Sequence, residues 1–213
     1  MFTNRTVTEL LDAFSSSDPT PGGGSAAALA GALGASLLAM VAGLPKSRTN
    51  SPEERSTLDA ARTSLLELRG DLIELVDRDA NAYDLVVAAY KLPKATDEEK
   101  ASRKAAIATG LRTATEIPLE TMRKCAEVLG LGKVVAERGN LSAASDIGVG
   151  LHLAMTGLSG ARLNVDTNLS SASDQSYAAS KRDELLLLMV GAGADFQAAN
   201  RAAGLSKVHT DQV

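Results

Sequence analysis

The fold is decided by residues 21–43, which read Pro21-Gly22-Gly23-Gly24-Ser25 and then AAALAGALGASLLAMVAG. Proline and three glycines are unfavourable inside a helix, so they predict a tight turn whose glycines can adopt positive φ and let a backbone or a ligand come close. The run from Ala26 to Leu44 is almost all Ala, Gly, Leu and Met, which predicts a helix buried on all sides. Small residues recur along it every three or four positions, at Gly24, Ala28, Ala32 and Ala35.

Three interpretations compete for this stretch. It can be a central core helix with a glycine-rich entry, or a cradle in which free N–H groups and the helix dipole hold a bound anion or ligand. It is also barely long enough to span a membrane. Gly and Ala dominate it, however, no aromatic belt flanks it, and no second such run occurs in the sequence. We therefore expect no association with a membrane.

The composition favours closely packed helices. The chain has 213 residues, of which 45% are hydrophobic but only 3% aromatic, with no Trp. The net charge of −4 argues against a nucleic-acid partner, because phosphate binding needs a basic surface. The single cysteine, Cys125, cannot form an internal disulfide, and the N-terminal sequence lacks the apolar segment of a signal peptide. We expect a cytoplasmic protein.

Apolar residues recur with helical spacing throughout, and no stretch alternates with period two for long. The expected fold is all-α: a single domain, residues 1–213, forming a bundle of about six helices around a long antiparallel helical core. Two capping boxes, Ser51 with Glu54 and Thr96 with Glu99, mark helix starts, and Pro118 should kink its helix rather than end it. The expected helices span about 3–14, 26–43, 51–92, 96–130, 142–168 and 174–203, with a frayed tail at 206–213.

Asp79 is the strongest candidate for chemistry. It interrupts an otherwise apolar stripe, spaced mainly by three and four residues, that runs through Leu58, Leu65, Leu68, Leu72, Leu75, Ala82, Val86 and Ala89. A carboxylate there is costly unless it is paired or lines a cavity. It is therefore either a general acid or base with a raised pKa, or a partner in a buried salt bridge or hydrogen bond. Asp77 is about 200° further round the helix and faces another way.

Other polar residues are more ambiguous. Asn140 and Asp146 stand at a loop and the first turn of a helix, where they either cap the helix or form a polar lip on a ligand cleft. Asn164 and Asn168 form an i, i+4 pair on an apolar helix, so their amides either bridge the core or contact a ligand. The two histidines and Cys125 are scattered without the spacing of a metal site, and we expect no metal.

Taken together, these segments resemble the formimino-tetrahydrofolate cyclodeaminase / methenyl-tetrahydrofolate cyclohydrolase family. The resemblance covers most of the chain in order. It rests on Pro19-Thr20-Pro21-Gly22-Gly23-Gly24-Ser25, on Val76-Asp77-Arg78-Asp79-Ala80-Asn81-Ala82-Tyr83, on Lys91-Leu92-Pro93-Lys94 with Lys100 and Arg103, on Ile117-Pro118-Leu119, and on Gly139-Asn140, Ser145-Asp146, Asn164 and Asn168-Leu169.

The resemblance implies an all-helical homodimer with a folate site near the subunit contact and a catalytic aspartate. The apolar stripe selects Asp79 for that role, with Asp77 in reserve. Substrate-binding candidates are Pro21, Gly22, Gly23, Gly24, Ser25, Lys46, Arg48, Asn140, Asp146, Asn164 and Asn168. One departure is that Leu44-Pro45-Lys46-Ser47-Arg48 replaces the family's usual Thr-x-Gly-Lys, so Lys46 or Arg48 would have to supply the cation for the folate carboxylates.

The implied reaction is hydrolysis of 5,10-methenyl-tetrahydrofolate to 10-formyl-tetrahydrofolate, with no cofactor beyond the tetrahydrofolate carrier, whose tail carries one or more glutamates. We prefer this activity because the chain has no room for the formiminotransferase domain that often accompanies the cyclodeaminase. The alternatives are a 5-formimino-tetrahydrofolate cyclodeaminase that releases ammonia, and a non-catalytic protein that binds folate or another helical partner.

Overall fold

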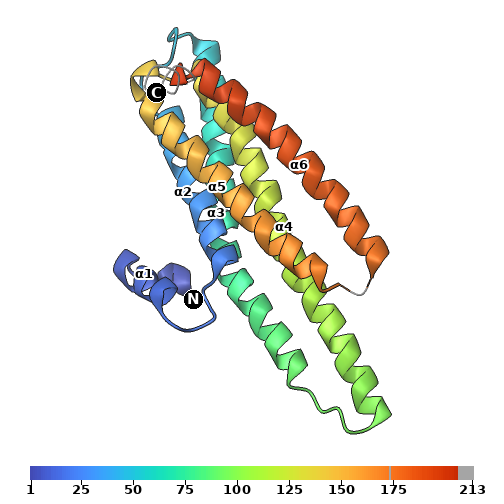
Figure 1. Ribbon diagram of the computed structural model, residues 1–213. Helices are drawn as coiled ribbons and strands as arrows, with labels where there is room; N and C mark the ends of the chain where they lie inside the picture. The colour runs from blue at the N-terminus through green and yellow to red at the C-terminus, as the bar shows by residue number, and fades with distance from the viewer. Residues whose placement is uncertain (173, 206–213) are drawn as a thin grey trace, which may run out of the picture.

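The computed structural model describes residues 1–172 and 174–205 and is built of helices (Figure 1). No strand occurs among these residues, which confirms the all-α prediction. The predicted frayed tail at 206–213 lies outside the described residues. In chain order the elements are the 3-10 helix η1 (Phe2–Asn4), α1 (Val7–Ser15), α2 (Gly23–Ala42), α3 (Pro52–Tyr90), α4 (Asp97–Arg138), the 3-10 helix η2 (Leu141–Ala143), α5 (Ala144–Ser170) and α6 (Gln175–Ala202).

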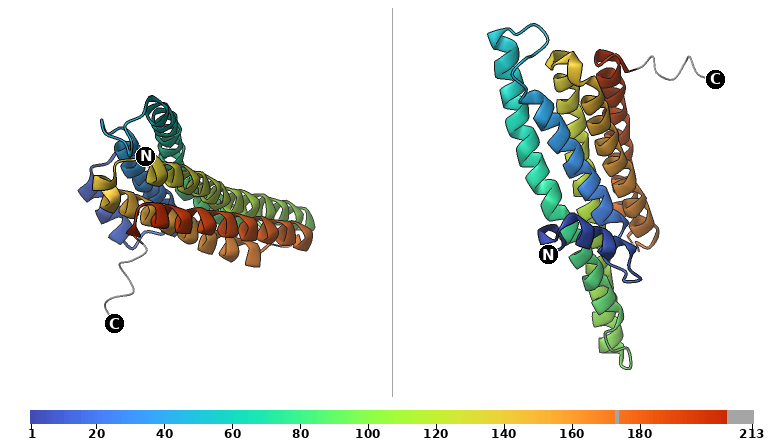
Figure 2. Two further views of the ribbon diagram at one scale, coloured as in Figure 1. Left: turned by 90° about the horizontal axis from the view of Figure 1, so that it is seen from above. Right: turned by 90° about the vertical axis from the view of Figure 1, so that its left-hand side faces the viewer.

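The long helices run side by side in alternating directions. The central helix α2 packs against α3 and α5, while α4 packs against α3, α5 and α6. Figure 2 shows α1 lying across the outside of the bundle, next to the N-terminal end of α2. The α3–α4 hairpin projects past the ends of α5 and α6 (Figure 1), so its tip stands clear of the rest of the bundle.

Small residues allow α2 to lie at the centre. A Cβ on Gly31 would come within 2.6 Å of the Cys125 sulfur, and one on Gly34 within 2.7 Å of the Gly150 carbonyl oxygen of α5. These distances are far below normal contact, so the helices approach through their backbones. Although α2 is long and apolar enough to cross a membrane, its neighbours bury most of it.

The helix starts agree with the sequence signals, with one difference. Thr96 and Glu99 form the predicted reciprocal capping box at the start of α4. At the start of α3 the Ser51 hydroxyl accepts from the Glu54 N–H, but the Glu54 carboxylate turns to the Ser47 hydroxyl and the Thr49 N–H instead. Only half of the predicted box forms there, because Glu54 fixes the preceding loop.

The N-terminal segment also differs from prediction. The expected helix over residues 3–14 is broken, because Thr6 caps α1 in a capping box with Glu9 and leaves η1 as a separate turn. The apolar side chains of Val7 and Leu11 are exposed, and α1 contains no buried residue. Leu10, Ala13 and Phe14 are half-buried, so only part of the apolar face of α1 is covered within this chain.

Replacing Gly34 with Ala should destabilise the fold by about 1–3 kcal/mol, because the new methyl group would press on backbone atoms of Gly150 and Ala154 that cannot move independently of α5. Urea unfolding measures the change. Gly70 is the matched control: it lies in α3 with open space around it, so Gly70→Ala should add up to about 1 kcal/mol through helix propensity alone. Equal effects of the two substitutions would contradict the close packing of α2 on α5.

Candidate active site

A cleft of about 300 Å³ opens where the N-terminal end of α2 meets the middle of α3 and the C-terminal end of α5. Asp79 is the only carboxylic acid among the residues that line it in the described part of the chain. The lining residues are Pro19, Thr20, Gly22, Gly23, Gly24, Asp79, Ala82, Tyr83, Val86, Leu111, Ala114, Asn164 and Asn168. The glycine segment, Asp79 and the two asparagines, which are far apart in sequence, thus lie around one space.

Gly24 lets α2 rest directly on the Asp79 carboxyl group. A Cβ at Gly24 would lie 2.1 Å from Asp79 Oδ1, so any other residue there would displace the acid. The predicted turn with positive φ is wrong: Gly22 has φ −111° and caps the helix, and Gly23 and Gly24 already belong to the first turn of α2. Glycine is needed here for close approach and not for a left-handed backbone.

Ser25 lies beneath the carboxyl group. Its hydroxyl oxygen is 2.8 Å from the Val76 carbonyl oxygen and 3.0 Å from Asp79 Oδ2. A hydroxyl has one proton to donate. It can donate to ionised Asp79, or it can donate to Val76 and accept a proton from neutral Asp79. The site therefore accommodates both protonation states of the acid with one small rotation.

Asp79 is partly buried, and this burial raises the pKa of its carboxyl group above the ordinary value of 3.8. The hydrogen bond from Ser25 acts in the opposite direction, because it favours the charged form. A carboxyl group whose pKa is moved toward neutrality can both take and return a proton during one reaction. The sequence left two interpretations of Asp79, an acid or base with a raised pKa or a partner in a buried salt bridge or hydrogen bond. Its position in the wall of the cleft supports the first.

Pro118 explains the orientation of Asn168. Proline has no N–H, so inside α4 the Ala114 carbonyl lacks its usual helical donor. The Asn168 side-chain nitrogen donates to that carbonyl oxygen at 2.7 Å. The prediction that Pro118 would not end the helix is confirmed, since α4 continues to Arg138. The missing hydrogen bond is replaced from α5, and this fixes the amide of Asn168 at the cleft.

Asn164 is oriented in a similar way. Its side-chain nitrogen donates to the Gly160 carbonyl at 2.9 Å, one turn back along α5. The side-chain nitrogens of both asparagines thus donate to backbone carbonyl oxygens. Within the described residues neither side-chain oxygen accepts a hydrogen bond. Since both residues line the cleft, these oxygens are available to hydrogen-bond donors on a ligand.

Asp77 binds the N-terminal segment and does not face the cleft. It is 8% exposed and accepts hydrogen bonds from the Phe2 N–H at 2.5 Å and the Thr3 hydroxyl at 2.7 Å. These bonds tie η1 to α3. Asp77 does not line the cleft, so the geometry favours Asp79 over the reserve candidate.

Two residues of the glycine segment differ from their predicted role as lining residues. Pro21 is buried and does not line the cleft. Ser25 is fully buried and touches Asp79 and backbone, so it positions the acid and does not reach a ligand directly. Tyr83, which is not among the predicted site residues, lines the cleft one helical turn beyond Asp79. The i, i+4 spacing could have identified it.

The remaining candidates lie at the opposite end of α2, about 30 Å away by the rise of a 20-residue helix. Arg48 donates to the Ala136 carbonyl at 2.6 Å and to the Ala202 carbonyl at 3.1 Å, which joins α4 to α6. Asn140 caps η2, and Asp146 stands in the first turn of α5. With Lys46 in the same loop as Arg48, none of these four residues meets the Asp79 cleft of its own chain. Their role in binding substrate stays a prediction that would require a second copy.

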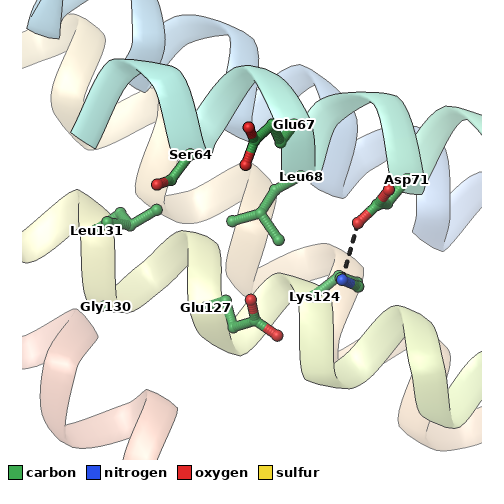
Figure 3. Close-up of a pocket in the computed structure, with 8 residues that line it drawn as sticks. All are labelled: Ser64, Glu67, Leu68, Asp71, Lys124, Glu127, Gly130 and Leu131. Atoms are coloured by element: carbon green, nitrogen blue, oxygen red, sulfur yellow. Dashed lines mark ion pairs between the residues drawn. The ribbon is translucent and has the colours of Figure 1, made fainter. Parts of the chain in front are cut away.

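A second groove, about 480 Å³, lies between α3 and α4 (Figure 3). It is acidic, with Glu67 and Glu127 beside the ion pair of Asp71 and Lys124, whose atoms are 2.8 Å apart. Among the described residues no group of three or more His, Cys, Asp or Glu is arranged to hold a metal ion. The expectation that no metal takes part stays a prediction. We take Asp79 as the candidate site, because its carboxyl group has no cationic partner within residues 1–172 and 174–205 and shares a cleft with the oriented amides.

A helical bundle whose cleft joins a carboxyl group of raised pKa to oriented amides has the features of an enzyme that works by general acid–base catalysis. Comparison with known proteins gives the family. Residues 6–186 match the formiminotransferase-cyclodeaminase family, and the chain belongs to it. This confirms the resemblance found in the sequence.

Relatives with two different names match the chain. It is 44% identical over 191 residues to a methenyltetrahydrofolate cyclohydrolase of Methylorubrum extorquens, covering 90% of this chain and 92% of that protein. It is 34% identical over 157 residues to a formimidoyltransferase-cyclodeaminase of Gallus gallus, covering 74% of this chain but 29% of that protein. The crystal structure of a formiminotetrahydrofolate cyclodeaminase from Thermotoga maritima has the same fold, with a TM-score of 0.85 over 96% of this chain and 98% of that chain at 22% identity.

Asp79→Asn should raise the free energy of unfolding at neutral pH. Because burial raises the pKa of folded Asp79 above 3.8, the unfolded chain loses this proton at a lower pH than the folded chain does. Stability is therefore lost as the pH rises from 3.8 through the raised pKa, and Asn removes that loss. Urea unfolding between about pH 4 and pH 8 measures it. A variant less stable than the wild type at neutral pH would contradict the raised pKa.

Asp77→Asn provides the control and should have the opposite sign. The Asp77 carboxylate accepts two hydrogen bonds, from Phe2 and Thr3, and an amide offers one acceptor oxygen in place of two. We expect a loss of about 1–3 kcal/mol in the same unfolding experiment.

Proposed function

We propose that this protein is a methenyltetrahydrofolate cyclohydrolase, which converts 5,10-methenyl-tetrahydrofolate and water to 10-formyl-tetrahydrofolate and a proton. The observation that carries the proposal is the partly buried Asp79 carboxyl group, held by Gly24 and Ser25 at the wall of a polar cleft. The 44% identity to a cyclohydrolase along nearly the full length of both chains supports this activity over the others.

The proposed reaction uses Asp79 twice. In the methenyl compound one carbon bridges N5 and N10 as a cationic amidinium, which a carboxylate attracts. Ionised Asp79 takes a proton from water as the water oxygen bonds to that carbon, giving a tetrahedral centre. Asp79 then returns the proton to N5 as the bond between carbon and N5 breaks. The new hydroxyl group gives its proton to solvent and becomes the carbonyl of the formyl group on N10. The Ser25 hydroxyl follows this cycle, since it can donate to the carboxylate or accept from the acid.

The two asparagines fit the pterin ring of such a substrate. A pterin carries an amino group and ring N–H groups along one edge, and the side-chain oxygens of Asn164 and Asn168 are unused acceptors at the cleft. The backbone of Gly22 and Gly23 borders the cleft without side chains, which leaves room for a flat ring to lie against it.

The cyclodeaminase activity is the second candidate, and the relatives named formimidoyltransferase-cyclodeaminase support it. That reaction needs a base to remove the N10 proton and an acid to protonate the departing ammonia. Asp79 could fill both roles. The chain spans only about 29–32% of these relatives, whose names include a second activity, so we rank this candidate below the cyclohydrolase.

We also propose that the protein acts as a homodimer in the cytoplasm. Leu33 and Met40 are exposed on the otherwise buried helix α2, and Val7 and Leu11 are exposed on α1. Burying these side chains against a second copy would remove apolar area from water. A sizing column tests this, and a clean monomer would contradict the dimer.

Asp79→Asn should lower kcat by about 10²-fold or more, since it removes the general acid–base group and keeps its shape. The assay follows the absorbance of the methenyl compound. Faster decay of added methenyl-tetrahydrofolate identifies a cyclohydrolase. Its appearance from 5-formimino-tetrahydrofolate, with ammonia, identifies a cyclodeaminase. Folate binding without decay or appearance of the methenyl compound would support the non-catalytic alternative. If Asp77→Asn lost activity and Asp79→Asn kept it, Asp77 would be the general base instead.

Ser25→Ala should move the acidic limb of the pH profile of kcat/KM to higher pH. The Ser25 hydroxyl lowers the pKa of Asp79, so its removal raises that pKa further. The first step needs the ionised acid, and more alkaline conditions are then required to form it. An unchanged limb in an active, folded variant would show that Ser25 does not set the protonation of Asp79.

A further inference from the structure

A short stretch of α4 around Pro118 departs from regular helix hydrogen bonding where the helix passes the cleft. Pro118 has no N–H to donate, and a proline ring inside a helix crowds the carbonyl four residues earlier, here that of Ala114. The buried Thr115 hydroxyl donates to the Leu111 carbonyl at 2.8 Å, a bond that often bends helices. Leu111 and Ala114 both line the cleft, so this irregular stretch lies at the candidate site.

The Ala114 carbonyl receives a hydrogen bond from another helix. The side-chain nitrogen of Asn168, on α5, donates to it at 2.7 Å. A carbonyl oxygen that is partly removed from water and has lost its helical donor favours such a partner. Asn164, one turn earlier on α5, differs, because its nitrogen donates to the Gly160 carbonyl of its own helix at 2.9 Å. The orientation of Asn168 therefore depends on α4, whereas that of Asn164 does not.

This orientation decides which polar group Asn168 offers to the cleft. An amide side chain carries a donor nitrogen and an acceptor oxygen on opposite sides of one carbon. With the nitrogen directed to Ala114, the oxygen remains for the cleft, and in the described part of the chain it accepts no hydrogen bond. A ligand that presents an N–H there is satisfied, whereas a ligand that presents only an acceptor meets a second acceptor.

We propose that Pro118 is a positioning residue that makes the cleft select for a hydrogen-bond donor on its substrate. It acts through Asn168: the proline frees the Ala114 carbonyl, the carbonyl holds the amide nitrogen, and the amide oxygen meets the ligand. The proposal rests on the proposed function, in which the donor is the 2-amino group or a ring N–H of the pterin. A residue with an N–H at position 118 would return the Ala114 carbonyl to α4 and leave the Asn168 amide free to turn over.

The first test measures, by calorimetry, the binding of tetrahydrofolate and of an analogue in which a methyl group replaces the 2-amino group. The wild type should bind tetrahydrofolate more tightly, and Pro118→Ala should reduce this preference about 2- to 10-fold, the range expected for one hydrogen bond. In turnover, KM for methenyl-tetrahydrofolate should rise by a similar factor with kcat unchanged, because Gly24 and Ser25 still hold Asp79. An unchanged preference would overturn the proposal.

Double-mutant cycles show whether Pro118 acts through Asn168. In the Asn168→Ala background, Pro118→Ala should have little further effect on the preference for the 2-amino ligand. Asn164 is the matched control, since it lines the same cleft and its bond to Gly160 does not involve α4. In the Asn164→Ala background the full effect of Pro118→Ala should remain. Equal effects in the two backgrounds would indicate a general disturbance of α4 and would overturn the positioning role.

Urea unfolding without ligand tests the link between Pro118 and Asn168 independently of the proposed function. With Pro118 in place, Asn168→Ala should lower the urea midpoint, because the Ala114 carbonyl loses its donor. In the Pro118→Ala background the new N–H supplies that donor, so the same substitution should lower the midpoint less. Equal shifts would overturn the exchange of donors.

The two proposals can fail separately. Loss of the ligand preference in Pro118→Ala supports the role of Pro118 even if the protein turns over neither methenyl- nor formimino-tetrahydrofolate. Turnover with an unchanged ligand preference in Pro118→Ala would support the proposed function and overturn the role of Pro118.

Discussion

The contact of Gly24 with the Asp79 carboxyl group is the constraint on which the site depends. A carboxyl group can be taken from water at a helix–helix junction only if the facing helix leaves room for it, and a glycine leaves the most room. The same use of small residues continues along α2, where Gly31 and Gly34 bring Cys125 and α5 into close contact. The geometry of the Asp79 cleft and the packing of the core thus depend on one property of α2, its lack of bulky side chains toward its neighbours.

The burial of Asp79 lowers the stability of the folded chain at neutral pH. Partial burial disfavours the ionised form of Asp79, and Ser25 offsets only part of that cost. Pro118 also has a local cost, because it removes one helical hydrogen bond from α4. The side chain of Asn168, on α5, donates a hydrogen bond in its place. In both cases a polar group on one helix, Asp79 or the Ala114 carbonyl, receives its hydrogen bond from a side chain of a neighbouring helix. The cleft is therefore formed by the tertiary structure, although each of its parts lies on a regular helix.

Sequence patterns could identify what depends on local spacing. Asp79 stood out because it interrupts a stripe whose members Leu72 and Leu75 are fully buried, and the helices could be placed because their periodicity and caps are local signals. The role of Ser25 could not be inferred, because it depends on a contact between residues 54 positions apart. The glycine segment was interpreted as a turn because the propensity of glycine disfavours a helix, yet packing against Asp79 overrode that propensity.

The positions of the basic residues also could not be inferred from their spacing in the sequence. Arg48 follows the glycine segment closely in sequence, but the intervening helix carries it about 30 Å along the bundle, where it binds backbone carbonyls. Lys94 and Lys104 follow Asp79 at a similar sequence distance, but α3 and the returning α4 keep them on the same side of the bundle as the cleft. Helix direction, and not separation along the chain, decides which charges lie at the same end of the bundle as Asp79. Because α4 runs back antiparallel to α3, it supplies both a wall of the cleft at Leu111 and Lys104 beyond it.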